Sequence, residues 1–172
     1  MHKFLALAPL VLLAAAPAQA QEVFAGLHAH GVNTPFSLSS GEEGGAELSL
    51  GYRFDTIGRT GIQPYVLGAL SSTGDTSYAA AGLSYRFGRQ LYVRPGIGLA
   101  IHNGSAGRFE RPDNGEIEFG SRVLFEPELA IGYQASERLG IEASWVHLSQ
   151  GQFFSRQNPG IDNIGVRLNW KL

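Results

Sequence analysis

The chain contains no cysteine in its 172 residues, which excludes disulfide bonds and any cysteine-ligated metal site. A strong charge of either sign is also missing, because the formal net charge is -2, so nucleic acid is not expected as a partner. The five histidines are scattered without ligand spacing, and we therefore expect no metal and no cofactor. A chain of this size without disulfides needs a substantial core or a closed hydrogen-bond network.

Long hydrophobic runs are absent after residue 20, and the run before it is short. A basic start at His2 and Lys3 is followed by an apolar stretch over 4–16 and by small residues at 18–20. This pattern is typical of a cleaved secretory signal, so we expect a mature chain that begins at Gln21 and forms a single domain over 21–172. The apolar stretch is shorter than the ~20 residues of a membrane-spanning helix.

Helical periodicity is missing from the mature chain, while 23 glycines and 8 prolines are spread through the sequence. Alternation of apolar and polar residues instead predicts an all-β fold. We expect eight strands, at 22–32, 44–54, 61–72, 76–87, 90–102, 117–134, 137–149 and 161–172. An even number of antiparallel strands can close into a barrel without exposed edges.

The two faces of these segments decide between a soluble barrel and a membrane barrel. Segment 90–102 has one wholly apolar face, formed by Leu91, Val93, Pro95, Ile97, Leu99 and Ile101. The opposite faces collect glycine and alanine, together with charges that can neutralise one another in a narrow lumen: Arg94, Glu126, Glu128, Glu142 and Arg167. Aromatic residues near strand ends suit interfacial girdles: Tyr52, Phe54, Tyr85, Phe87, Tyr133 and Trp170. We therefore expect an eight-stranded antiparallel transmembrane β-barrel of the Gram-negative outer membrane; the alternative is a soluble periplasmic ligand carrier.

Three residues of complementary chemistry lie around the last expected hairpin. In a strand, residues two apart share a face, so His147 and Ser149 lie on one side with Trp145, and Asp162 lies on the apolar face of the following strand. If both termini are periplasmic, loops 33–43, 103–116 and 150–160 are extracellular, and the three side chains sit near the outer rim facing lipid. A serine becomes a nucleophile when a histidine takes its proton and a carboxylate orients the histidine. Polar groups on a lipid-facing stripe are candidates for function.

The stretch from His147-Leu148-Ser149 to Asn158-Pro159-Gly160-Ile161-Asp162 resembles the PagL family of lipid A 3-O-deacylases. The resemblance implies an outer-membrane enzyme that uses no metal and removes the ester-linked 3-hydroxyacyl chain at position 3 of lipid A. It implies His147 as base, Ser149 as nucleophile and Asp162 as acid.

The sequence departs from that family at two positions. Gln150 stands where family members commonly have asparagine, and the acid is Asp162 where it is often glutamate. By resemblance, Asn158 and the amides around Gly151 are candidates to stabilise the oxyanion, although Asn-Pro-Gly is also a turn former in its own right. The main alternative is a barrel without catalysis, either structural or inactivated at Gln150. The oligomeric state, monomer or homodimer, is left open by the sequence.

Overall fold

The computed structural model describes residues 21–37, 42–109, 114–153, 156 and 158–172. The expected signal segment, residues 1–20, lies outside this range. The strands are β1 (Glu22–Ala29), β2 (Ala46–Arg53), β3 (Ile62–Ser71), β4 (Tyr78–Tyr85), β5 (Phe87–Gly88), β6 (Leu91–His102), β7 (Val123–Gln134), β8 (Leu139–Ser149) and β9 (Gly160–Lys171).

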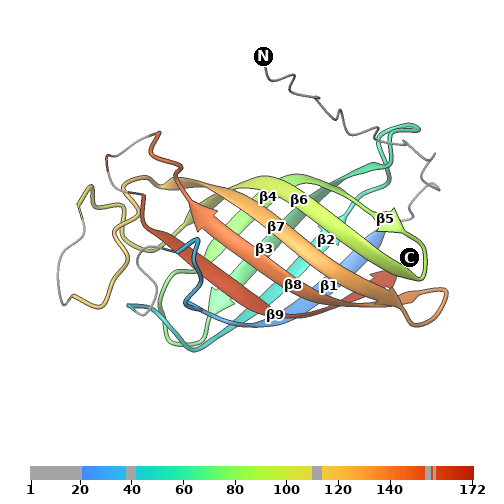
Figure 1. Cartoon of the computed structure of the whole chain (residues 1–172), viewed down its shortest axis with the longest axis horizontal. Coiled ribbons are helices and arrows are strands. Elements are labelled where there is room, and N and C mark those ends of the chain that lie inside the picture. The colour runs from blue at the N-terminus through green and yellow to red at the C-terminus, as the bar shows by residue number, and fades with distance from the viewer. Residues whose placement is uncertain (1–20, 38–41, 110–113, 154–155, 157) are drawn as a thin grey trace, which may run out of the picture.

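All strands belong to one antiparallel sheet in the order β4-β3-β2-β1-β9-β8-β7-β6-β5, and a pairing between β4 and β6 closes it into a barrel. β4 and β5 form one barrel strand interrupted at Arg86: Ser84 pairs with Gly96 and Phe87 with Val93, so the register on β6 continues across the gap. The architecture is therefore the expected closed, eight-stranded, all-β barrel. In Figure 1 the long connections gather at one end of the barrel, and the C-terminus lies at the other.

The interior of the barrel is polar. Arg53, Arg94 and Arg167 are almost completely buried and are paired with carboxylates. Arg94 lies 3.3 Å from Glu142 and Arg167 lies 2.8 Å from Glu128. The expected neutralisation inside the lumen is confirmed for these pairs. Removing one partner of such a buried pair is costly, because the remaining charge has neither water nor a counterion.

The outer wall carries the apolar rows. On β6, for example, the side chains of Ile97, Leu99 and Ile101 are exposed on this wall. A soluble carrier with an apolar interior is therefore the wrong alternative. Four of the six aromatic residues expected near strand ends form edge and tilted pairs at the end of the barrel that carries the C-terminus, Tyr52 with Phe54 and Tyr85 with Phe87. Within the part of the chain that the structure describes, no helix is long and apolar enough to span a bilayer.

The structure corrects one strand boundary. The expected strand 117–134 begins at Val123, and Ile117 and Phe119 are instead fully buried. The ring of Phe119 packs 4.7 Å from that of His102, and its amide donates to the carbonyl of Ser105. The alternation of Ile117 and Phe119 with glutamates imitates a strand, but this segment packs against the end of β6 and does not extend the sheet.

Candidate functional site

The pairing of β8 with β9 brings His147 and Asp162 together. The two residues are direct cross-strand partners, and neighbours of this kind have Cβ atoms roughly 5 Å apart on one face of the sheet. His147 Nδ1 lies 2.8 Å from Asp162 Oδ1. Because the distance between the strands is short, the short side chain of aspartate reaches the imidazole without a change of register.

Two further donors hold the Asp162 carboxylate. The indole N–H of Trp145 donates to Oδ1 at 2.8 Å, and the hydroxyl of Thr34 donates to Oδ2. Both carboxylate oxygens are therefore bound, one by the imidazole and the indole and the other by a residue from the connection after β1. Charge-assisted hydrogen bonds of this kind favour an ionised carboxylate in a fixed orientation.

Ser149 is the next residue of β8 on the face that carries His147. Its cross-strand partner on β9 is Gly160, and its partner on β7 is Phe125. A Cβ built on Gly160 would lie 2.7 Å from Cε1 and 3.2 Å from Nε2 of His147. The edge of the ring that carries Nε2 thus lies over the Gly160 backbone, next to the strand position of Ser149. The edge that carries Nδ1 faces the Asp162 carboxylate.

The site is on the outer wall of the barrel, but it is covered. The sequence predicts that His147, Ser149 and Asp162 face lipid, whereas their exposed fractions are only 9%, 8% and 0%. The segment 31–37, which follows β1, covers the β9 side of the site. Val32 donates its amide to the Asp162 carbonyl at 2.8 Å, and the hydroxyl of Ser37 donates to another β9 carbonyl. The connection therefore shields polar side chains that would face the acyl chains of the membrane if the strands alone formed the surface.

The chain turns sharply after Ser149. Gly151 and Gln152 have φ values of 61° and 63°, and the amide of Phe153 donates to the carbonyl of Gln150. Two successive positive φ values define a turn in which glycine is favoured at the first position. Gln150 is fully buried. Asn158 is partly buried, and its Oδ1 has no hydrogen-bond partner among the described residues. Their assignment to the oxyanion remains a prediction.

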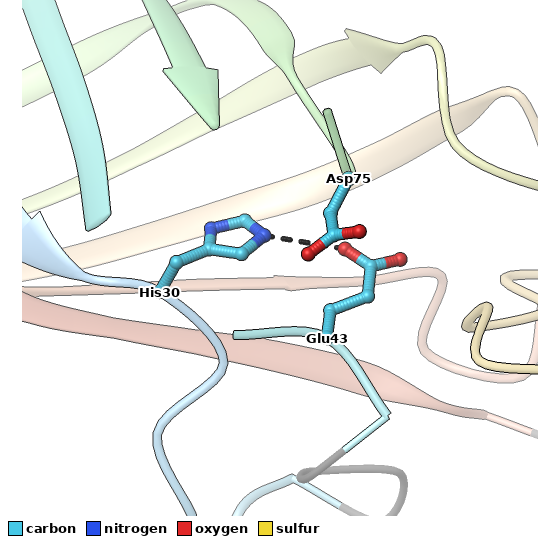
Figure 2. A group of neighbouring side chains, drawn as sticks. All are labelled: His30, Glu43 and Asp75. Carbon is cyan, nitrogen blue, oxygen red and sulfur yellow. Dashed lines mark hydrogen bonds and ion pairs between the residues drawn. The ribbon is translucent and has the colours of Figure 1, made fainter. Parts of the chain in front are cut away.

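A second polar cluster lies at the mouth of the barrel, formed by His30, Glu43 and Asp75 (Figure 2). One ligand atom from each residue lies within 4.8 Å of the other two, and the two carboxylates point toward the imidazole edge in Figure 2. An imidazole and two carboxylates are a donor set that can hold a divalent metal. The spacing of the histidines in the sequence did not indicate this grouping, because Glu43 and Asp75 reach His30 through the fold.

The existing hydrogen bonds give this cluster another role. His30 Nε2 lies 3.2 Å from Glu43 Oε2, and its Nδ1 lies 3.4 Å from Glu47. Burial acts to lower the pKa of His30, but the hydrogen bonds to Glu43 and Glu47 outweigh it and raise the pKa to about 9. Glu43 also accepts from the amides of Thr76 and Ile117. A protonated imidazole thus already stands where a cation would bind, and the cluster ties together connections from three parts of the chain.

Sequence reasoning missed the residues that hold the Asp162 carboxylate. Thr34 lies in a connection without periodicity, so nothing local indicated its contact with β9. Trp145 shares the outer face with His147, and this parity was the one available signal that its indole N–H can reach Asp162.

The comparisons with known proteins show the family of the chain. The family model described as lipid A 3-O-deacylase (PagL) matches residues 46–171. No curated protein matches the sequence. The family match includes β2 to β9 and hence His147, Ser149 and Asp162, but not the segment that contains Thr34.

Solved structures agree on the fold. The crystal structure of the outer membrane enzyme PagL superposes with a TM-score of 0.58 at 17% identity, covering 88% of this chain and 99% of that one. The crystal structure of Neisserial surface protein A superposes with a TM-score of 0.57 at 13% identity, covering 91% and 100%. At these identities the likeness concerns the fold, and it places this barrel among those of the Gram-negative outer membrane.

Proposed function

Because the chain belongs to the lipid A 3-O-deacylase family, we propose that it hydrolyses the ester at position 3 of lipid A with a Ser149-His147-Asp162 triad. Membership in the family shows the broader part of this proposal, namely a hydrolase that acts on lipid A in the outer membrane. The identity of the bond and of the catalytic residues is our proposal. The observation that carries it is the 2.8 Å contact between His147 Nδ1 and Asp162 Oδ1 on the outer wall, beside Ser149.

In the proposed reaction, His147 Nε2 accepts the proton of the Ser149 hydroxyl as its oxygen attacks the ester carbonyl. Asp162 holds the Nδ1–H tautomer and stabilises the imidazolium that forms. The tetrahedral intermediate then collapses with cleavage of the bond between the acyl carbon and the sugar 3-oxygen, and the imidazolium gives its proton to that oxygen, which leaves as the 3-hydroxyl. A water molecule, activated by the same imidazole, hydrolyses the acyl-serine to release the 3-hydroxy fatty acid.

The oxyanion requires hydrogen-bond donors near Ser149. We assign this task to the backbone amide of Gly151 and the side-chain amide of Asn158, with Gln150 supporting the turn that carries Gly151. One such donor is worth about 3 kcal/mol of transition-state stabilisation in acyl transfer.

Exposed aromatic rings support a lipid substrate. Phe36 is 69% exposed and packs 5.7 Å from Trp145, while Phe153 is 75% exposed and packs 5.4 Å from Phe125. Since Phe125 is the cross-strand partner of Ser149, the two aromatic pairs lie near the site. Acyl chains can pack against such rings, which aligns the ester with the triad without a cavity in the barrel.

The test is lipid A deacylation by the purified protein in mixed detergent micelles, read by mass spectrometry. The wild type should remove one 3-hydroxyacyl chain from position 3. Ser149→Ala and His147→Ala should each lose on the order of 10⁴-fold in kcat, while folding, read by the gel shift on boiling, is unchanged.

Ser49→Ala is a matched control. The Ser49 hydroxyl is buried and has no hydrogen-bond partner among the described residues, and it lies on β2, which is not paired with β8 or β9. Its loss should leave deacylation intact. Full activity in Ser149→Ala, or loss of a chain from another position, would contradict the proposal.

A further inference from the structure

We propose that Thr34 is a positioning residue of the site, acting through Asp162, so that the connection after β1 is a working part of the enzyme. This inference rests on the proposed function. It adds to the triad a residue from outside the matched segment 46–171.

The hydroxyl of Thr34 has its direction fixed by its other contact. Thr34 Oγ1 accepts the amide proton of Phe36 at 3.1 Å and lies against Asp162 Oδ2. A hydroxyl has one proton to give. Since the contact with Phe36 uses an oxygen lone pair, that single proton is available for Asp162.

The backbone around Thr34 is itself attached to β9. Gly31 donates its amide to the side-chain oxygen of Asn163 at 3.2 Å, and Val32 donates to the main-chain carbonyl of Asp162 at 2.8 Å. Three residues later, the Ser37 hydroxyl donates to the Gly160 carbonyl at 2.7 Å. These contacts bracket Thr34 on both sides, so its hydroxyl is held at Asp162 by the backbone and not by side-chain contacts alone.

The consequence for His147 is geometric. Its partner oxygen, Asp162 Oδ1, also accepts the Trp145 indole N–H, and rotation of the carboxylate would exchange Oδ1 for Oδ2 or break both bonds. Thr34 opposes that rotation by binding the second oxygen. Without the hydroxyl, the carboxylate is held from one side only, and the imidazole spends less time with Nε2 directed toward Ser149.

The experiment compares wild type, Thr34→Val and Thr34→Ser on lipid A in mixed micelles. Valine keeps the shape and removes the hydroxyl, and serine restores it. In Thr34→Val we expect kcat to fall about 10-fold, equivalent to about 1.4 kcal/mol, with KM unchanged; Thr34→Ser should stay within about 3-fold of wild type. Thr56→Val, in the connection after β2, removes a hydroxyl whose hydrogen bond is local to its own turn and should change neither constant.

A second readout does not depend on activity. The Nδ1–H proton of a histidine bound to a carboxylate gives an NMR signal far downfield, and in Thr34→Val this signal of His147 should move upfield or broaden, returning in Thr34→Ser. Unchanged kcat in folded Thr34→Val would overturn the positioning role. If the wild type itself does not deacylate lipid A, the proposed function fails. The NMR signal then tests the contact between Thr34 and Asp162 on its own, and a His147 signal unchanged in Thr34→Val would overturn that contact as well.

Discussion

Gly160→Ala is the sharpest perturbation of the site. The added Cβ would lie 2.7 Å from Cε1 of His147, whereas ordinary contact begins at 3.4 Å, so the ring must retreat by roughly 0.7 Å. The ring cannot do so freely, because its Nδ1 is bound to Asp162 at 2.8 Å. Misplacement of a catalytic group by about 1 Å can cost roughly 10²-fold, and we therefore expect kcat to fall about 10- to 100-fold.

The measurement is the rate of 3-hydroxy fatty acid release from lipid A, with folding checked by the gel shift on boiling. The control is Gly68→Ala on β3, where an added Cβ meets nothing within 4 Å; kcat should be unchanged. Alanine replaces glycine in a strand in both variants, so the intrinsic backbone effect on stability, on the order of 0.5–1 kcal/mol in favour of alanine, is matched. In Gly160→Ala the Cβ also lies 3.1 Å from the carbonyl oxygen of Leu148, and the folding check detects any cost of that contact. Wild-type kcat in folded Gly160→Ala would show that the imidazole does not work from its position over the Gly160 backbone.

Three further predictions concern Gln150, His30 and Arg167. Gln150→Asn should deacylate lipid A at a rate comparable to wild type; activity seen only in the asparagine variant would mean that the natural chain is a barrel without catalysis. The pKa of His30 in the folded protein, about 9, lies above the ordinary value of 6.5. Protonated His30 therefore contributes up to about 3 kcal/mol to the free energy of unfolding. This contribution is fully present below pH 6.5 and is lost as the pH rises through 9. The unfolding temperature in detergent should fall over that range, and His30→Gln should remove most of this fall. Arg167→Leu leaves Glu128 without its 2.8 Å partner and should cost about 3–5 kcal/mol, measured by urea unfolding.

The barrel was predictable from sequence because its signal is local. Alternation places every second residue on the outer wall, and this parity predicts that His147 and Asp162 lie on the outward faces of neighbouring strands. The register matches it, since the two residues are cross-strand partners. In the lumen the same rule identified Arg94 and Arg167, but other members of the network, such as Arg53, were not recognised as part of it.

The rest depends on contacts between segments that are distant in sequence. Thr34 is separated from Asp162 by 128 positions, and no periodicity links an irregular connection to a strand that far away. The same limit explains why the sequence predicts lipid exposure for the site: alternation describes the wall of the barrel, but not the segment that folds over it. His30 and Glu43 were likewise invisible as a pair, because their contact depends on how the connection after β1 returns to the sheet.

The filled lumen has a consequence for how substrate and protein meet. With Arg53, Arg94 and Arg167 buried inside, the proposed site lies on the outer wall near the rim of the barrel, where it meets molecules of one leaflet. Encounter then takes place by lateral diffusion in two dimensions, and the rate follows the mole fraction of substrate in the surface and not its bulk concentration. Adding inert detergent while the total amount of lipid A is kept constant lowers the mole fraction of lipid A in each micelle and should therefore slow the reaction.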